Sequence, residues 1–261
     1  MTDKMLADKS PPIGTMTFNN PARHNAVSSD MWAAAAEIMT DFVADDAIRA
    51  IIVTGAGGKA FVSGADISKF EDERANAEAE ELYHARTTEA REKLINAPKP
   101  TIAKIRGYCI GGGVATALAC DIRICSDNSR FAIPAAKLGL GYDYAGIRRL
   151  VDVVGPSFAK EIFYTARQFS AEEARDMGLV DRVVPADELD AYVQSYAETI
   201  AGNAPMTMHA LKTSVAELVK DPADRDLDLC DELVEAANHS EDYEEGRAAF
   251  MEKRKPNFVG R

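Results

Sequence analysis

Hydrophobic and polar positions recur in a strand, helix, strand rhythm along most of the chain. Apolar and threonine positions alternate over residues 14–18, which predicts a strand with one polar face. Ser28 or Ser29 could cap a helix over residues 30–43, and residues 49–54 form an apolar run typical of a buried strand. The rhythm recurs near residues 102, 122 and 180. It predicts an α/β fold with a mostly parallel sheet and helices outside.

The sequence after residue 169 predicts a short helix, with a start signal and an end signal. Ser170 and Glu173 have the spacing of a capping box, which predicts a helix start there. Gly178 is expected to end this helix before a strand over residues 179–184.

The pattern becomes helical throughout from Pro205 onward, with a break at Asp221-Pro222 and a run from about residue 225 to 253. Residues 71–81 are rich in acidic side chains and alanine, which is typical of a solvated helix.

Two glycine-containing clusters, residues 61–67 and 106–113, each follow an apolar run that predicts a buried strand. Glycine at a strand exit lets backbone N–H groups approach a bound atom, because no Cβ obstructs it. A helix is predicted to begin after Gly111, so its first amides would point their dipole at the same place. Either cluster alone also fits a tight turn. Together they predict an oxyanion hole, whose donors each stabilise a developing negative charge by about 3–4 kcal/mol.

Composition and net charge exclude several classes of partner. The chain has 261 residues, 46% of them hydrophobic and 28% charged, which is typical of a globular protein with a large core. Its net charge of -12 disfavours nucleic acid and anionic membranes as partners. The apolar stretch near residues 31–39 is too short to span a bilayer, and the first residues do not form a signal segment.

The cysteines and histidines show no metal-site spacing, so no metal is expected. Three of the four cysteines lie in apolar surroundings, which favours a reducing, cytoplasmic location. Neither glycine cluster has the pattern of a dinucleotide-binding or phosphate-binding loop. The sequence therefore predicts no NAD or ATP site.

The two clusters and their setting resemble the crotonase superfamily, also called the enoyl-CoA hydratase/isomerase family. The resemblance covers nearly the whole chain. Its ordered matches are Asn20-Pro21-Ala22-Arg23-His24-Asn25-Ala26, Ser63-Gly64-Ala65-Asp66, Lys99-Pro100-Thr101-Ile102-Ala103, Gly107-Tyr108 with the glycine triplet, Cys120-Asp121-Ile122-Arg123, Gly178-Leu179-Val180 and Phe250-Met251-Glu252-Lys253-Arg254.

The resemblance implies a spiral of ββα units that carries the acyl-CoA site, over residues 1–200. It implies a helical region over residues 201–261 that builds homotrimers, often paired into hexamers. It also implies an acyl-CoA thioester substrate, with no cofactor apart from the CoA of that substrate. For residues 71–81 it implies a mobile segment beside the acyl pocket that gates the substrate, as the alternative to a solvated helix.

The carboxylates that family hydratases use are expected at two positions, and both hold alanine here. These positions are Ala115, two residues after the glycine triplet, and Ala135, after the proline of Phe-x-x-Pro. Because a methyl group cannot transfer a proton, two-glutamate hydration is not expected. Asp143 matches the position from which family isomerases supply an aspartate. The alternative is that Asp143 caps a helix beginning near Ala145, and both roles can coexist.

The catalytic set implied by the resemblance is therefore the amides of Ala65 and Gly112 with the carboxylate of Asp143. Tyr142 and Tyr144 flank this aspartate and could line the pocket, although core packing is the usual role of such residues.

Residues for CoA follow from the same resemblance, because an acidic protein needs local cations for the CoA phosphates. Six positions are expected to contact CoA: Arg23, Lys59, Ser63, Ile67, Phe250 and Lys253. The last two would come from a neighbouring subunit. Lys253 also fits a solvated helix end.

Three hypotheses follow. The first is double-bond isomerisation of an enoyl-CoA, with Asp143 moving the proton. The second is hydration or another enolate reaction with a replacement acid, and the third is an acyl-CoA-binding homologue without catalysis.

Overall fold

The computed structural model describes residues 2–66, 69 and 76–261, and it contains two sheets that share turns of one spiral. The six-stranded sheet has the order β1-β2-β3-β5-β7-β10, and the four-stranded sheet has the order β4-β6-β8-β9. The strands of the larger sheet are β1 (Met5–Ser10), β2 (Ile13–Phe18), β3 (Ala50–Gly55), β5 (Thr101–Ile105), β7 (Ile122–Ser126) and β10 (Arg182–Val184). Those of the smaller sheet are β4 (Ala60–Val62), β6 (Tyr108–Ile110), β8 (Arg130–Ala132) and β9 (Phe169–Ser170).

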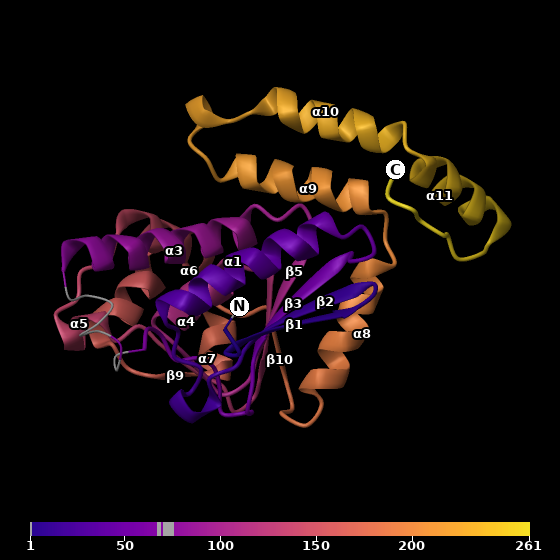
Figure 1. The fold of residues 1–261 in the computed structure, drawn as a ribbon. Helices are drawn as coiled ribbons and strands as arrows, with labels where there is room; N and C mark the ends of the chain where they lie inside the picture. Colours follow the sequence, from indigo (N-terminus) through magenta and orange to yellow (C-terminus); the bar gives the residue numbers. More distant parts are fainter. Residues whose placement is uncertain (1, 67–68, 70–75) are drawn as a thin grey trace.

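Each turn of the spiral gives one strand to each sheet, so that β3, β5 and β7 pair in parallel while β4, β6 and β8 do the same. Helices follow the strand pairs: α1 (Ser29–Ala44), α3 (Ala77–Ile95), α4 (Gly112–Leu118), α5 (Ala135–Leu138), α6 (Tyr144–Thr165), α7 (Ala171–Asp176) and α8 (Leu189–Ala201). Figure 1 shows this α/β arrangement. The predicted fold class, an α/β spiral of ββα units, is confirmed.

The two faces of the larger sheet are covered differently. Helix α8 packs on one face, where its leucine, valine and alanine side chains meet the isoleucines of the strands. The other face and the smaller sheet enclose the main core, which includes Phe18, Phe61 and Phe131, each at most 1% exposed. This burial of aromatic side chains fixes the strand ends that carry the glycine clusters.

The last part of the chain forms helices α9 (Pro205–Leu218), α10 (Leu227–Asn238) and α11 (Glu241–Glu252), with a short 3₁₀ turn at Pro222–Asp224. Helices α9 and α10 lie side by side above the larger sheet, and α11 projects at the end of the molecule (Figure 1). The predicted helical character is confirmed. The expected single run over residues 225–253 is wrong, because Ser240 accepts a hydrogen bond from Tyr243 N at 3.1 Å and starts a separate helix.

The other local signals of helix ends have different outcomes. Ser28 is the N-cap residue of α1, but its side chain accepts no capping hydrogen bond and its hydroxyl donates to the Asp30 carboxylate instead. The capping box of Ser170 and Glu173 forms, and helix α7 ends before Gly178, whose φ is +78°. The strand expected over residues 179–184 is shorter, because Leu179 and Val180 are buried in the core and only Arg182–Val184 pairs with β7. Residues 77–81 form the start of α3 and are mostly exposed, as predicted for a solvated helix, while the earlier part of that acidic segment lies outside the described residues.

Candidate active site

The two glycine clusters meet at the ends of β4 and β6, although about fifty residues separate them in the chain. A Cβ placed on Gly64 would lie 3.8 Å from Gly112 N, and one placed on Gly112 would lie 3.6 Å from Gly64 Cα. Gly64 has φ +106° and Gly111 has φ +54°, conformations that side-chain-bearing residues rarely adopt. The two clusters therefore meet, as the sequence analysis predicted.

Two further glycines make this close approach possible. A Cβ on Gly107 would lie 2.0 Å from Lys59 O, and one on Gly113 would lie 2.0 Å from Val62 O. Both distances are far inside van der Waals contact, so the first turn of α4 can lie against β4 only when residue 113 has no side chain.

The amides of Ala65 and Gly112 are left without acceptors at this junction. Around Ala65, Val27 N donates to Gly64 O at 2.9 Å and Asp66 N donates to Val27 O at 3.0 Å. Gly111 N donates to Ala132 O at 2.8 Å. Within the described part of the chain, the N–H groups of Ala65 and Gly112 donate to no backbone or side-chain acceptor. Because Gly112 is the first residue of α4, its amide also carries the positive end of that helix.

The residues expected to carry acid–base chemistry surround α4 and the start of α6. Ala115 is half-buried in α4, and Ala135 is buried at the start of α5. Asp143 is exposed and caps α6, where its Oδ1 accepts a hydrogen bond from Gly146 N at 2.6 Å. The capping role is therefore confirmed, and it occupies only one of the two carboxylate oxygens.

The tyrosines on either side of Asp143 differ. Tyr142 is half-buried and packs edge-on against Phe163, with ring centroids 5.0 Å apart. Burial raises the pKa of Tyr142. Tyr144 is 78% exposed, so core packing, the usual role expected for both tyrosines, is wrong for Tyr144.

Arg91 is a residue of this region that the sequence analysis did not single out. Its Nη2 lies 3.5 Å from Gly112 O, and its guanidinium carbon lies 5.2 Å from the centroid of the Trp32 ring. Its Nε is buried without a hydrogen-bond partner. A basic residue at position 91 falls within the buried stripe of α3, between Thr87 and Leu94. A basic residue within a buried helical stripe was the signal that could have pointed to Arg91.

The residues expected at the CoA end are partly brought together. Ser63 Oγ donates to Arg23 O at 3.3 Å, so Arg23 lies beside the first glycine cluster with its side chain exposed. Lys59 is exposed, and its carbonyl accepts a hydrogen bond from Tyr108 N of the second cluster at 3.1 Å. Ile67 lies outside the described residues.

Phe250 and Lys253 lie far from this junction within one chain. Helix α11 is at the opposite end of the molecule from α4 and α5 (Figure 1). Phe250 is 81% exposed, and Lys253 ends α11 in a left-handed conformation with φ +57°. A contact with the site therefore requires a second copy of the chain, as the sequence analysis expected.

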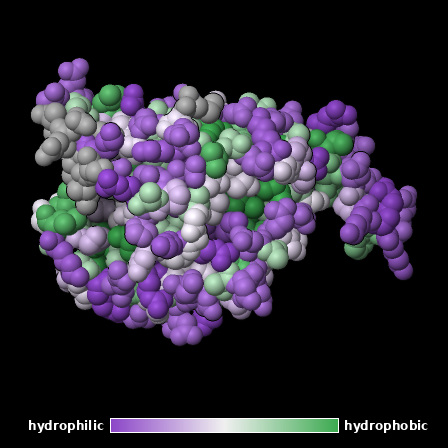
Figure 2. All heavy atoms as spheres, turned by 60° about the horizontal axis from the view of Figure 1, so that its bottom comes forward, coloured by the Kyte–Doolittle hydropathy of each residue, from purple (hydrophilic) through white to green (hydrophobic). Residues whose placement is uncertain are grey.

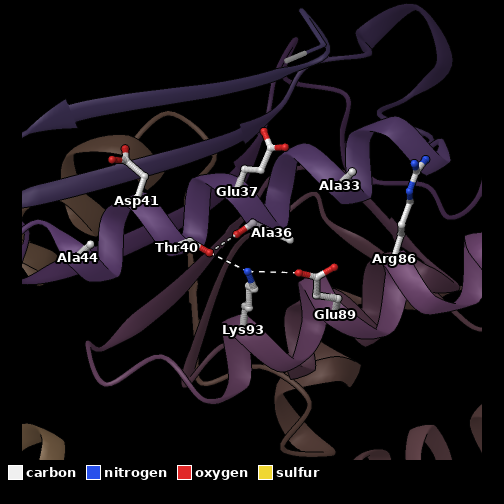
Figure 3. A pocket seen from close by; sticks show the side chains of 9 residues that line it. All are labelled: Ala33, Ala36, Glu37, Thr40, Asp41, Ala44, Arg86, Glu89 and Lys93. Atoms are coloured by element: carbon white, nitrogen blue, oxygen red, sulfur yellow. Dashed lines mark hydrogen bonds and ion pairs between the residues drawn. The ribbon is translucent and has the colours of Figure 1, made fainter.

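A surface groove lies elsewhere, between α1 and α3. Figure 3 shows its lining, in which Lys93 Nζ bridges Thr40 Oγ1 at 2.7 Å and a carboxylate oxygen of Glu89 at 3.2 Å. The groove does not include any of the predicted site residues; its lining residues are Ala33, Ala36, Glu37, Thr40, Asp41, Ala44, Arg86, Glu89 and Lys93. Hollow shape alone therefore does not locate the candidate site.

Other chemical groups are structural. Cys109, Cys120 and Cys125 are buried, as predicted from their apolar surroundings, and burial raises the pKa of Cys120 and Cys125 to about 12. The residues that the structure describes include no group of His, Cys, Asp and Glu side chains that could hold a metal ion. In the same residues, every helix is too short or too polar to cross a membrane.

Comparison with known proteins agrees with this geometry. The family model described as enoyl-CoA hydratase/isomerase matches residues 8–261. The chain is 32% identical to a crotonyl-CoA hydratase of Syntrophomonas wolfei subsp. wolfei, with 99% of each chain covered. It is 34% identical to a carnitinyl-CoA dehydratase of Escherichia coli O157:H7, with both chains covered completely.

A solved structure gives the same result. The crystal structure of an enoyl-CoA hydratase/carnithine racemase from Magnetospirillum magneticum is 37% identical and has a TM-score of 0.92 to this chain, covering 100% of this chain and 97% of that one. The spiral fold, the paired glycine clusters and these matches define a crotonase-type acyl-CoA enzyme. The chain belongs to the enoyl-CoA hydratase/isomerase family.

Proposed function

We propose that this protein isomerises the double bond of an enoyl-CoA thioester, with the amides of Ala65 and Gly112 holding the thioester oxygen. The observation that carries the proposal is the pair of amides without acceptors at the meeting point of the two glycine clusters. Donors that are fixed before the reaction stabilise an enolate without reorganising, which is the main electrostatic contribution in such sites.

Asp143 supplies the proton transfer in this proposal. For a 3-enoyl thioester, its free oxygen removes the proton from C2, and the electron pair of that C–H bond moves into a dienolate held at the thioester oxygen. The carboxylic acid then returns the same proton to C4, which leaves the double bond between C2 and C3. One carboxylate suffices because one proton leaves and returns.

The alanines at positions 115 and 135 support isomerisation over hydration. Hydration needs one group to activate water and another to protonate carbon, and neither methyl group can do so. The hydratase names of relatives favour the second candidate, an enoyl-CoA hydratase that uses a replacement acid. Tyr142 is the neighbouring group that could replace it, although burial raises its pKa and opposes its ionisation.

The CoA part would lie along Arg23, Lys59 and Ser63 at the outer side of the first cluster. Exposed cations there offset the negative charge of the whole protein locally, which phosphate binding requires. Phe250 and Lys253 would complete this end from a neighbouring subunit of a homotrimer or homohexamer.

A substrate panel with Asp143→Asn tests the proposal. Asparagine keeps an oxygen for Gly146 N but cannot accept a proton, so kcat for conversion of 3-enoyl-CoA to 2-enoyl-CoA should fall about 10²-fold or more. Absorbance of the conjugated thioester measures isomerisation, while a mass gain of one water reports hydration.

Asp226→Asn is the matched control, because Asp226 caps α10 through Leu229 N at 2.9 Å and lies outside the site. Both substitutions should change the unfolding free energy by only about 1 kcal/mol. Unchanged isomerisation in Asp143→Asn would remove the proton-transfer role. Strong hydration of 2-enoyl-CoA by the wild type would favour the second candidate, and absence of any conversion would leave an acyl-CoA-binding protein.

A further inference from the structure

We infer that Arg91 forms an anion-binding subsite beside the candidate oxyanion hole, and that the preferred acyl-CoA carries a carboxylate on its acyl group. This inference rests on the proposed acyl-CoA function and specifies its substrate class.

The first observation is that the Arg91 guanidinium is almost unpaired. Arginine has five N–H donors, and within the described chain Arg91 makes a single long hydrogen bond, from Nη2 to Gly112 O at 3.5 Å. Thr116 Oγ1 already donates to that carbonyl at 2.8 Å. The buried Nε of Arg91 has no partner. Donors in this state favour an acceptor that arrives with the ligand.

The second observation is that no carboxylate of the described chain lies within ion-pair distance of this guanidinium. Asp143 is near enough to affect the pKa of Arg91 but is exposed and bonded to Gly146 N. Burial is the main cause that lowers the pKa of Arg91, and Tyr142 and Tyr83 are among the nearby groups that affect it. A charge left buried without a partner is unfavourable unless it serves a ligand.

The charge of a second arginine acts in the same direction. Arg149, on α6, is half-buried, and its charge lowers the pKa of Arg91, while Asp152 on the same helix raises the pKa of Arg149. An anion that meets Arg91 is therefore also favoured by the positive charge of Arg149.

The position of Arg91 sets where the ligand's negative charge must be. Its Nη2 lies 3.4 Å from the place where a Cβ on Gly112 would be, and Gly112 N is a proposed oxyanion donor. A carboxylate that meets this guanidinium therefore belongs to the acyl group, a few bonds from the thioester carbonyl. The substrate class that fits is a short dicarboxylic acid joined to CoA through one of its two carboxyl groups.

Trp32 keeps the guanidinium in place. Its buried ring lies 5.2 Å from the guanidinium carbon, and such cation–π contact orients a planar guanidinium without using its N–H donors. The donors thus stay free for a carboxylate, which an arginine fork binds in bidentate fashion.

Calorimetry with succinyl-CoA and butyryl-CoA tests the inference, because these thioesters have the same number of acyl carbons and differ in a terminal carboxylate. The full-length wild type should bind succinyl-CoA about tenfold or more tightly than butyryl-CoA. Arg91→Gln and Arg91→Met should abolish that preference while binding of free CoA stays unchanged. Lys93→Gln is the control on the same helix, because Lys93 lies in the groove between α1 and α3, and it should keep the preference.

Melting of the ligand-free protein separates a binding role from a structural one. Arg91→Met should melt no lower than the wild type if the guanidinium is held for a ligand, since a buried unpaired charge is removed. A lower melting temperature with an intact succinyl-CoA preference would overturn the inference. If Arg91 variants do not fold, Arg149→Gln should reduce the preference at least about threefold.

The outcomes distinguish the two proposals. Equal or tighter binding of butyryl-CoA by the wild type overturns the carboxylate subsite and leaves the acyl-CoA function standing. Binding of neither thioester overturns both.

Discussion

Two regions differ in how completely their packing is made within one chain: the junction of the glycine clusters and the C-terminal helices. At the junction, the backbone is fixed within a single chain. Main-chain hydrogen bonds hold it, and so do close contacts that are possible only because glycine has no Cβ. Helices α9–α11 instead leave large apolar side chains open to solvent, including Leu211 and Leu218 at 65% and Phe250 at 81% exposure. Figure 2 shows hydrophobic surface near the end where these helices project.

This difference separates the site residues that one chain positions from those that need a second copy of the chain. The proposed oxyanion donors are positioned by contacts within the spiral, so a monomer already has them. Exposed apolar faces are typical of association surfaces, which supports the proposed homotrimer or homohexamer. The proposed contributions of Phe250 and Lys253 therefore depend on assembly, whereas Ala65 and Gly112 do not.

The largest expected effect breaks the junction itself. In Gly113→Ala the new Cβ would meet Val62 O, a backbone atom that cannot move away without shifting β4. We expect a loss of about 4 kcal/mol or more in unfolding free energy, or no folded protein at all. Urea unfolding followed by circular dichroism, at one fixed protein concentration, measures it.

Gly141→Ala is the matched control, because a Cβ at Gly141 meets nothing within 4 Å. Its unfolding free energy should stay within about 0.5 kcal/mol of the wild type. A Gly113→Ala protein as stable as this control would contradict the close approach of β4 and α4.

The second effect concerns the C-terminal helices. Leu211 and Leu218 are seven residues apart and share one face of α9. If this face joins subunits, the wild type should have the mass of a trimer or hexamer in light scattering, and Leu211→Asp with Leu218→Asp should give single chains. The reason is that charged groups would have to be buried unpaired in the interface.

Leu6→Asp is the control, since Leu6 is an exposed leucine of β1 outside the C-terminal helices, and it should leave the assembly intact. A wild type that is monomeric at micromolar concentration would refute the prediction. It would also remove Phe250 and Lys253 from the acyl-CoA site.

The sequence predicted the junction well because its signal is local and steric. Glycines at strand exits and an apolar run before each cluster can be recognised without knowing what packs around them. The capping roles of Ser170 and Asp143 were predictable for the same reason, since a cap is formed within three residues.

Arg91 could not be predicted in the same way. A basic residue in a helix usually points to solvent, and only the packing of α3 against α1 places this guanidinium between Trp32 and Gly112. Similarly, the separation of α11 from α10 depends on the Ser240 cap, which a continuous helical pattern conceals. Residues whose role depends on distant segments are those that sequence analysis misses.

The smallest expected effect tests how the projecting end is held. Glu245 accepts two hydrogen bonds from Arg254, at 2.6 and 2.8 Å, and one from Asn257 N at 2.7 Å. The hydrogen bonds from Arg254, and to a smaller extent the one from Asn257 N, lower the pKa of Glu245 to about 2. Because the folded-state pKa lies below the unfolded-state value, this contribution to stability is complete above the unfolded-state pKa and is lost as pH falls towards 2.

Glu245→Gln keeps an acceptor oxygen and removes the charge, so the wild type should be slightly more stable than this variant near neutral pH. The difference should vanish as pH approaches 2, and salt should reduce it at neutral pH because the pair is exposed. Urea unfolding of both proteins across this pH range measures the difference directly. A difference that persists unchanged at the lowest pH would show that Glu245 holds the C-terminal segment through packing or neutral hydrogen bonds rather than through its charge.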